Sequence, residues 1–182
     1  MLARALGPET VLLREPGGTP VGERVRQILK DPELELSPAA ELLLFSAARS
    51  QLANEVVAPA REAGRDVVCD RYIDSTVAYQ GVARGLGIEA VEELNSMVIG
   101  GCVPDVTVLI RVDVDTAWDR GQQRMAEDGA DRFESEGIEF QRDVAAAYDD
   151  LAERHPERIV VVDGDGPPKE VHARVLEVVQ GR

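Results

Sequence analysis

The sequence predicts an α/β fold in which a parallel sheet is flanked by helices. Four runs of five to seven residues are rich in Val, Ile and Leu and barely alternate with polar residues. Strands read in this way when both faces of a parallel sheet are covered. Longer stretches with helical spacing separate the runs, which indicates right-handed crossovers, and 182 residues suit a single domain over 1–182. The expected strands cover 10–14, 66–70, 106–112 and 158–163.

Helices are expected between these strands and after the last one. The longest begins after Ser37, a favourable N-cap, has Pro38 in its first turn and ends just before Gly64. The remaining helices are expected at 22–30, 74–82, 88–99, 115–126, 136–154 and 169–180. Because ligands of open parallel sheets bind beyond the carboxyl ends of the strands, the segments to inspect follow Arg14, Asp70, Val112 and Asp163.

Charge and hydropathy exclude two classes of partner. Twenty Lys and Arg against 34 Asp and Glu give a net charge of −14, whereas nucleic-acid binders and proteins on anionic membranes need a basic field. No apolar run approaches the ~20 residues that span a bilayer, and the first residues lack the apolar core of a signal peptide. We expect a cytoplasmic protein in which Cys69 is a buried free thiol; neither it nor Cys102 has metal-ligand spacing.

A compact loop follows the first expected strand, with the sequence REPGGT over 14–19. Pro-Gly-Gly favours a turn, so a plain turn is one interpretation. A binding loop is the other, because the charged residues Arg14 and Glu15 stand at the carboxyl end of a strand, and Arg26 follows in the next helix.

The long helix carries an arginine within an apolar stripe. Leu42, Phe45, Arg49, Leu52 and Val56 recur at helical spacing and should face the core. A guanidinium there must be paired or must bind a ligand, because burying it alone is costly. One interpretation is a salt bridge to another helix. In the other, Phe45 offers a stacking face and Arg49 offers donors to a planar heterocycle with carbonyl edges.

The second expected strand ends in Asp70-Arg71. Such a pair suits a site that handles metal and phosphate together, although an N-cap with a surface ion pair is the alternative. The helix that follows carries two pairs of polar residues one turn apart, which form either a hydrogen-bonding wall or a solvated face. These pairs are Ser75 with Tyr79 and Thr76 with Gln80.

Arginines surround a Gly- and Asp-rich stretch at 127–131. This pattern is equally consistent with a solvated charge run and with a mobile lid at about 124–136. Lids exclude water, and their arginines stabilise charge on a transferring phosphoryl group. The candidate lid residues are Arg120, Arg124 and Arg132.

Taken together, these motifs resemble bacterial thymidylate kinases. The stretches REPGGT, LLLFSAARSQ (42–51), CDRYIDSTVAYQGVARG (69–85), PDVTVLIRVD (104–113) and DRFE (131–134) follow the order and spacing of that family over essentially the whole chain. The resemblance implies a P-loop nucleoside monophosphate kinase-like fold. It also implies Mg²⁺-dependent phosphorylation of dTMP to dTDP by ATP, in dTTP synthesis, and a homodimer packed through helices that include 88–99.

The resemblance assigns roles to residues of the acceptor site. Phe45 would stack on thymine, Arg49 would donate to its O4 edge, and Thr76 and Gln80 would complete the base contacts. Tyr79 would lie under the deoxyribose and disfavour a 2′-hydroxyl. The dTMP site so implied comprises Glu15, Arg26, Phe45, Arg49, Arg71, Ser75, Thr76, Tyr79 and Gln80.

The same resemblance assigns the phosphate and metal contacts. Arg26 and Arg71 would hold the dTMP phosphate, with Asp70 near Mg²⁺ and Glu15 near the sugar or the metal. Arg124 and Arg132 would reach ATP from the lid. The residues expected to act in catalysis are Asp70, Arg71 and Arg132.

The chain departs from the family pattern on the ATP side. Kinases of this architecture open with a strand, a G-x-x-x-x-G-K-[ST] loop and a helix. Neither lysine here, Lys30 after Leu29 or Lys169 after Pro168, can be the loop lysine, and MLARALG resembles the last turns of the helix after such a loop. The first strand and P-loop are therefore expected to be absent, which would leave the strands beside them unpaired.

Two accounts of this departure remain open. In the first, the chain starts at an internal Met, and an upstream strand, loop and helix complete a dTMP kinase. In the second, the short form is a catalytically inactive protein that binds dTMP or dimerises. A further possibility is a kinase of the same architecture for another nucleotide or a nucleoside, and Arg71, placed for an acceptor phosphate, disfavours a nucleoside.

Overall fold

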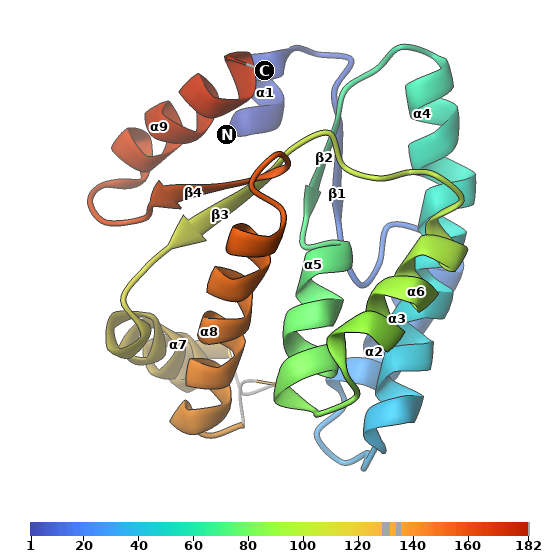
Figure 1. Ribbon diagram of the computed structural model, residues 1–182, viewed down its shortest axis with the longest axis vertical. Coiled ribbons are helices and arrows are strands. Elements are labelled where there is room, and N and C mark those ends of the chain that lie inside the picture. Colours follow the sequence, from blue (N-terminus) through green and yellow to red (C-terminus); the bar gives the residue numbers. More distant parts are fainter. Residues whose placement is uncertain (129–131, 134–135, 182) are drawn as a thin grey trace.

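The computed structural model describes residues 1–128, 132–133 and 136–181. In this part of the chain, helices surround four strands that form two parallel pairs, each strand at a position expected from the sequence (Figure 1). Strand β1 (Val11–Arg14) pairs with β2 (Val67–Asp70), and β3 (Thr107–Arg111) pairs with β4 (Ile159–Asp163). The α/β class and the parallel pairing are thus confirmed.

The strands form two separate ladders rather than one continuous sheet. Within the described part of the chain, no ladder joins the β1–β2 pair to the β3–β4 pair. The parallel sheet expected from the sequence is thus divided into two pairs of strands. Apolar side chains on the strands are correspondingly exposed: Leu12 to 67% and Ile110 to 49%.

Each expected helix is present, within a few residues of its expected ends. Ser37 caps the long helix by accepting a hydrogen bond from Ala40 N at 3.3 Å, and Gly64 follows its end with φ 68°. The α-helices are α1 (Leu2–Leu6), α2 (Pro20–Lys30), α3 (Pro38–Leu52), α4 (Ala58–Glu62), α5 (Ile73–Thr76), α6 (Ile88–Ile99), α7 (Val114–Asp128), α8 (Ile138–Arg154) and α9 (Pro168–Gln180). Two π-helical segments, η1 (Ala53–Val57) and η2 (Val77–Ala83), interrupt the long helix and extend α5.

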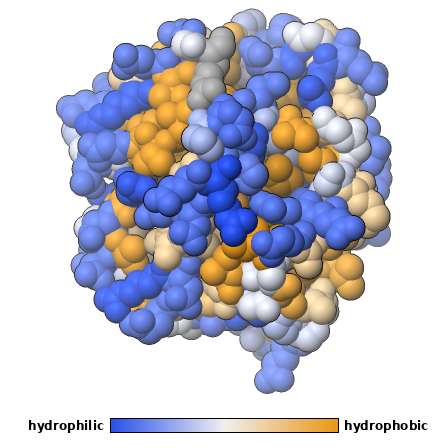
Figure 2. Space-filling model, in the orientation of Figure 1, coloured by the Kyte–Doolittle hydropathy of each residue, from blue (hydrophilic) through white to orange (hydrophobic). Residues whose placement is uncertain are grey.

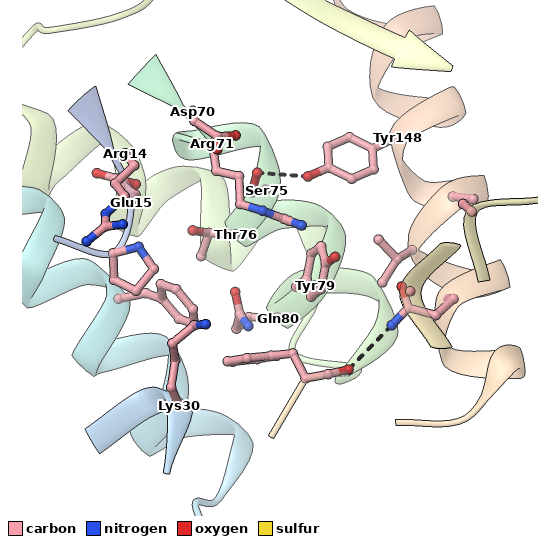
Figure 3. A pocket seen from close by; sticks show the side chains of 18 of the residues that line it. Arg14, Glu15, Lys30, Asp70, Arg71, Ser75, Thr76, Tyr79, Gln80 and Tyr148 are labelled. Carbon is pink, nitrogen blue, oxygen red and sulfur yellow. Dashed lines mark hydrogen bonds between the residues drawn. The ribbon is translucent and has the colours of Figure 1, made fainter. Parts of the chain in front are cut away.

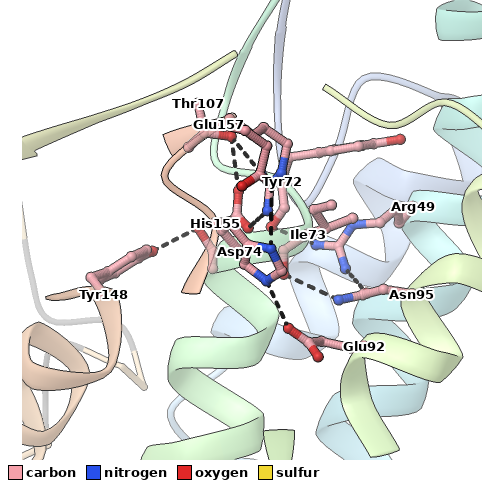
Figure 4. Close-up of polar contacts among 12 residues, drawn as sticks. Arg49, Tyr72, Ile73, Asp74, Glu92, Asn95, Thr107, Tyr148, His155 and Glu157 are labelled. Atoms are coloured by element: carbon pink, nitrogen blue, oxygen red, sulfur yellow. Dashed lines mark hydrogen bonds and ion pairs between the residues drawn. The ribbon is translucent and has the colours of Figure 1, made fainter. Parts of the chain in front are cut away.

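A buried ion pair fixes the start of the α5–η2 helix against the second ladder. The guanidinium of Arg158 donates to both carboxylate oxygens of Asp74 at 2.7 Å. Thr107 at the start of β3 donates to the same carboxylate at 2.9 Å, and Figure 4 shows Thr107 and Asp74 together. Because Asp74 directly precedes the polar pairs of the sequence analysis, this anchor determines where those pairs lie.

The polar surface agrees with the sequence analysis, whereas the burial of Cys69 does not. Figure 2 shows that hydrophilic side chains cover much of one face, as the net charge of −14 leads one to expect. No helix in the described part of the chain is long and apolar enough to cross a membrane. Both cysteines are free, but Cys69 is only half-buried, whereas Cys102 is buried. The expectation of a buried Cys69 was therefore wrong in degree, because β2 has little packed on one side.

Candidate functional site

A cavity of about 910 Å³ opens beyond the carboxyl ends of β1 and β2 (Figure 3). Arg14 and Glu15 enter it from the end of β1, Asp70 and Arg71 from the end of β2, and Val112 from the end of β3. The segment after Asp163 does not contribute. Three of the four strand ends selected from the sequence therefore converge on one cavity, as expected for parallel strands.

All residues predicted for the dTMP site line this cavity. They come from the loop after β1, from α2, from α3, from the connection after β2 and from the α5–η2 helix. Asp70 lines it as well. Sequence positions up to 65 residues apart, from Glu15 to Gln80, thus meet at one site.

The loop after β1 is both a turn and a wall of the cavity. Thr19 caps α2 by accepting a hydrogen bond from Gly22 N at 2.9 Å. Arg26 Nη1 donates to the Pro16 carbonyl at 2.9 Å, so a residue of α2 supports the loop. A Cβ on Gly22 would stand 2.8 Å from the Gly17 carbonyl oxygen, so only glycine allows α2 to approach this closely.

Arg49 is buried, at 1% exposure, and lies at the centre of a polar cluster (Figure 4). Its Nε and Nη2 donate to Glu15 Oε2, at 2.8 and 2.5 Å, and Nη2 also donates to the Tyr72 carbonyl at 3.2 Å. Nη1 donates to Asn95 Oδ1 at 2.8 Å. A guanidinium has five N–H groups, so these four hydrogen bonds leave one, on Nη1, without a partner in the described residues.

The ion-pair interpretation of Arg49 therefore holds in part. Its ion-pair partner is Glu15, from a loop rather than from another helix, and its side chain also lines the cavity. Burial raises the pKa of the Glu15 carboxyl, while the charge of Arg49 opposes that shift. The second oxygen of Glu15, Oε1, is buried with no hydrogen-bond partner among the described residues. Such an atom needs a donor from a ligand or a water molecule.

Arg71 is held in an unusual backbone conformation at the mouth of the cavity. Its φ of 65° is the only positive value among the non-glycine residues described, and such strain is typical of functional positions. Its guanidinium lies 5.0 Å from the ring centroid of Tyr79. Tyr148 on α8 donates to Ser75 Oγ at 2.8 Å on the same side, and burial raises the pKa of Tyr148.

The other end of the cavity is aromatic and buried. Phe45 and Tyr79 both contact Phe133, with ring centroids 5.8 and 6.2 Å away. Thr76 and Gln80 are each 1% exposed, so the solvated-face interpretation is wrong for this pair. Thr76 Oγ1 has no hydrogen-bond partner among the described residues. A flat apolar surface beside unsatisfied polar atoms suits a planar heterocycle.

Two of the three expected lid arginines, Arg120 and Arg132, do not line the cavity. Arg120 is exposed and is not a lining residue. Arg132 turns away to Glu41, with 2.6 Å between Nη1 and Oε2, and donates from Nε to the Leu29 carbonyl. A buried carboxylate attracts it more strongly than an open cavity does. The side chain of Arg124, and residues 129–131 and 134–135 of the expected lid, lie outside what the structure describes.

Several lining residues were missed by sequence analysis. Trp118 on α7, Tyr148 on α8 and Lys30 on α2 all line the cavity. Lys30 lies one turn beyond Arg26 on the same face of α2. Tyr148 lies four residues after Val144 and seven after Gln141, so these three lining residues share one face of α8. Once one of them is known to line the cavity, helical periodicity identifies the other two.

The carboxylates of the site fit Mg²⁺ only in part. Among the described lining residues, the acidic ones are Glu15 and Asp70, and no cluster of three metal-ligating side chains occurs in the described part of the chain. Glu15 is committed to Arg49, whereas Asp70 is exposed at the end of β2. Mg²⁺ in phosphoryl-transfer sites needs one or two carboxylates plus phosphate oxygens and water. Asp70 alone satisfies that requirement.

Comparison with known proteins identifies a family. The family model described as Thymidylate kinase matches residues 1–175. The chain is similar to the thymidylate kinase of Deinococcus radiodurans, with 44% identity over 180 residues, covering 98% of this chain and 85% of the relative. It is also similar to that of Halothermothrix orenii, with 40% identity over 175 residues, covering 96% and 84%.

A solved structure agrees with these sequence matches. The crystal structure of thymidylate kinase from Ehrlichia chaffeensis superposes with a TM-score of 0.74 at 32% sequence identity. The match covers 94% of this chain and 82% of that one.

Proposed function

This chain belongs to the thymidylate kinase family, and from that premise we propose that it binds dTMP in the cavity for transfer of the γ-phosphoryl group of ATP. The products are dTDP and ADP. The observation that carries this proposal is the convergence of the family's dTMP residues on one cavity, with an aromatic end and a cationic end.

The aromatic end supports binding of the base. Phe45 offers its ring as a stacking face, and the remaining N–H of Arg49 suits a carbonyl oxygen such as thymine O4. Thr76 and Gln80 add polar atoms at the same wall. Tyr79 lies between these residues and Arg71, where its ring would contact the sugar.

The cationic end supports binding of the phosphate. Counted over the whole described lining, five residues are cationic (Arg14, Arg26, Lys30, Arg49 and Arg71) and two are anionic, so the cavity has a local charge of +3 in a chain whose net charge is −14. A cavity of one sign attracts ligands of the other. Arg71 and Arg26 are assigned to the acceptor phosphate, where their donors can chelate its oxygens.

The chain's own residues orient the acceptor and stabilise charge. Phosphoryl transfer asks for little covalent chemistry from a protein and depends on in-line placement and on positive charge around the moving group. Arg71 supplies that charge beside the acceptor oxygen. Asp70 is the residue assigned to hold Mg²⁺, which, when bound, neutralises charge on the ATP oxygens. Glu15 is assigned to Arg49 rather than to the metal.

We also propose that the protein is a homodimer and that it acts in dTTP synthesis in the cytoplasm. Large apolar side chains are exposed on two helices that pack on each other: Leu43 on α3 to 59% and Met97 on α6 to 72%. A dimer packed through this face would cover them. Sedimentation analysis should give a dimer for the protein and a monomer for Met97→Glu. A monomeric parent protein would overturn this part.

Calorimetry and a coupled assay test the function in two steps. Titration with dTMP should show saturable binding, with weaker binding of dCMP, UMP and thymidine. Release of ADP in the presence of dTMP, ATP and Mg²⁺ should then be measured with a coupled assay. Absence of dTMP binding by the folded protein would overturn the proposal. Binding without turnover would limit it to dTMP recognition.

A further inference from the structure

Glu41 is a fully buried carboxylate next to the base end of the cavity that does not itself line it. It is 0% exposed and lies on α3 one turn before Phe45. Buried carboxylates are rare unless paired. Three side chains from other elements converge on this one: Gln80 from η2, Arg84 just beyond η2, and Arg132.

The geometry of this cluster determines which atom of Gln80 faces Glu41. Nε2 of Gln80 donates to Glu41 Oε1 at 2.6 Å. The same carboxylate accepts from Arg84 Nε at 3.3 Å and Nη2 at 3.4 Å, and from Arg132 Nη1 at 2.6 Å. A carboxylate that pairs with two guanidinium groups has only acceptors to offer. The amide nitrogen of Gln80 must therefore point toward Glu41.

The opposite atom of that amide is then available to the cavity. Gln80 lines the cavity, and no hydrogen bond to its Oε1 occurs in the described part of the chain. With the nitrogen engaged by Glu41, rotation of the amide by half a turn would place Oε1 against a carboxylate. Glu41 thereby keeps an acceptor, and not a donor, directed at a bound base (Figure 3 shows Gln80 below Thr76 in this wall).

The cluster also holds Glu41 itself in place. Arg84 forms a second ion pair, to Glu136 at 2.6 Å, and its guanidinium lies 4.7 Å from the ring centroid of Phe140. Arg132 is anchored by the Leu29 carbonyl as well as by Glu41. Both arginines that pair with Glu41 are thus held by further contacts, which restricts the rotamers of Glu41 and, through it, of Gln80.

We propose that Glu41 is a positioning residue that selects the base by fixing Gln80 as a hydrogen-bond acceptor. A base that presents a ring N–H to Gln80, as thymine and uracil do at N3, is accepted. Cytosine presents a lone pair at N3, so its binding would leave two buried acceptors facing each other. This inference rests on the proposed function, because it takes the base to lie at the Phe45 end.

Equilibrium binding tests the inference without depending on turnover. Trp118 is the only tryptophan of the chain and lines the cavity, so its fluorescence reports ligand binding. The dissociation constants of dTMP, dUMP and dCMP are measured for the full chain, for Glu41→Gln and for Glu136→Gln. Glu136→Gln is the control, because it removes a carboxylate that pairs with Arg84 but does not contact Gln80.

Glu41→Gln should reduce the preference for dTMP over dCMP by about tenfold, because an amide at position 41 accepts either orientation of Gln80. Glu136→Gln should keep the wild-type ratio. The swap Glu41→Gln with Gln80→Glu restores a donor and an acceptor at the contact and keeps an acceptor toward the base, so it should recover much of the preference. A general loss of packing would change all three affinities together and leave their ratio constant.

The outcomes distinguish failure of the positioning role of Glu41 from failure of the proposed dTMP binding. A folded wild-type protein that binds no dTMP would overturn the proposed function. A wild-type preference for dTMP that persists in folded Glu41→Gln would overturn only the positioning role. If Glu41→Gln does not fold, the ratio is measured in Glu41→Asp, which keeps the charge for the arginines and withdraws it from Gln80. An unchanged ratio there, or failure of every variant to fold, also overturns the positioning role.

Discussion

Arg49 and Glu15 form a buried ion pair in which two nitrogens of the guanidinium donate to one carboxylate oxygen, at 2.8 and 2.5 Å. The pair joins the last turn of α3 to the loop after β1, and both side chains line the cavity. The loop after β1 and the face of α3 that carries Phe45 and Arg49 are thereby held in a fixed relationship. The arginine that resembles a base-binding residue is also a structural one.

Arg49→Met should therefore destabilise the protein strongly. It leaves Glu15 as a buried carboxylate without its partner, a change that costs about 3–5 kcal/mol of the free energy of unfolding. Urea denaturation gives the number. Asp149→Asn, which breaks the exposed pair with Arg111, is the matched control and should cost below about 1 kcal/mol. A loss of similar size in both variants would contradict the structural role of Arg49.

Arg71→Met should weaken dTMP binding while sparing thymidine. The guanidinium is assigned to the acceptor phosphate, and hydrogen bonds to charged groups contribute about 1.5–3 kcal/mol, so the dissociation constant of dTMP should rise by about 10- to 100-fold. Calorimetry with both ligands separates the phosphate contact from a general loss of the site. Arg142→Met, at an exposed ion pair on α8, should change neither value. Equal weakening of dTMP and thymidine would refute the phosphate assignment.

Tyr79→Ala should relax discrimination against a 2′-hydroxyl. The ring is held between the Arg71 guanidinium and the rings of Phe133 and Phe140, so it cannot easily move aside for a larger sugar. The preference for dTMP over its ribonucleotide counterpart should fall by about tenfold, the scale on which a pocket discriminates one small group. Tyr79→Phe keeps the ring and should keep the preference. The ratio of the two dissociation constants is the measurement.

Stability should fall as the pH rises above about 9. Burial is the main cause that raises the pKa of the Cys69 thiol and of the Tyr72 hydroxyl in the folded protein, above their usual 9.0 and 10.0. Between those usual values and the raised ones, the unfolded chain loses protons that the folded chain retains. The unfolded state then binds fewer protons, so the free energy of unfolding decreases with pH.

Urea denaturation at several pH values between 7.5 and 10.5 measures this slope. Cys69→Ala removes one of the two groups and should flatten the decline between pH 9 and 10. A free energy of unfolding that is constant or rising over this range would show that neither group is held protonated by the fold.

The regular elements could be predicted because their causes are local. Ser37, Pro38 and Gly64 mark the ends of the long helix through capping and backbone preference, and the Val-rich runs mark the strands. The π-helical segments within the long helix and after α5 were not anticipated, since nothing in residue type separates them from ordinary helix.

The candidate site was predictable where residues follow strand ends or share a helix face. The loop with Arg14 and Glu15, the Asp70–Arg71 pair and the face of α3 were found in this way, and they meet at one cavity. Arg132 was misplaced because its partner, Glu41, lies 91 positions away and its burial has no sequence signal. Trp118 was missed because no other residue of α7 was known to line the cavity. Helical spacing alone therefore did not show which face of α7 points toward it.

The sequence by itself determined the strands, the helices, the family and the residue types of the acceptor site, because each depends on neighbours a few positions apart or on motifs in fixed order. The tertiary structure decided the partners: Glu15 for Arg49, Glu41 for Gln80 and for Arg132. Hydrogen bonds and ion pairs are effective only over a few ångströms, so which charge meets which is fixed only after distant segments have packed.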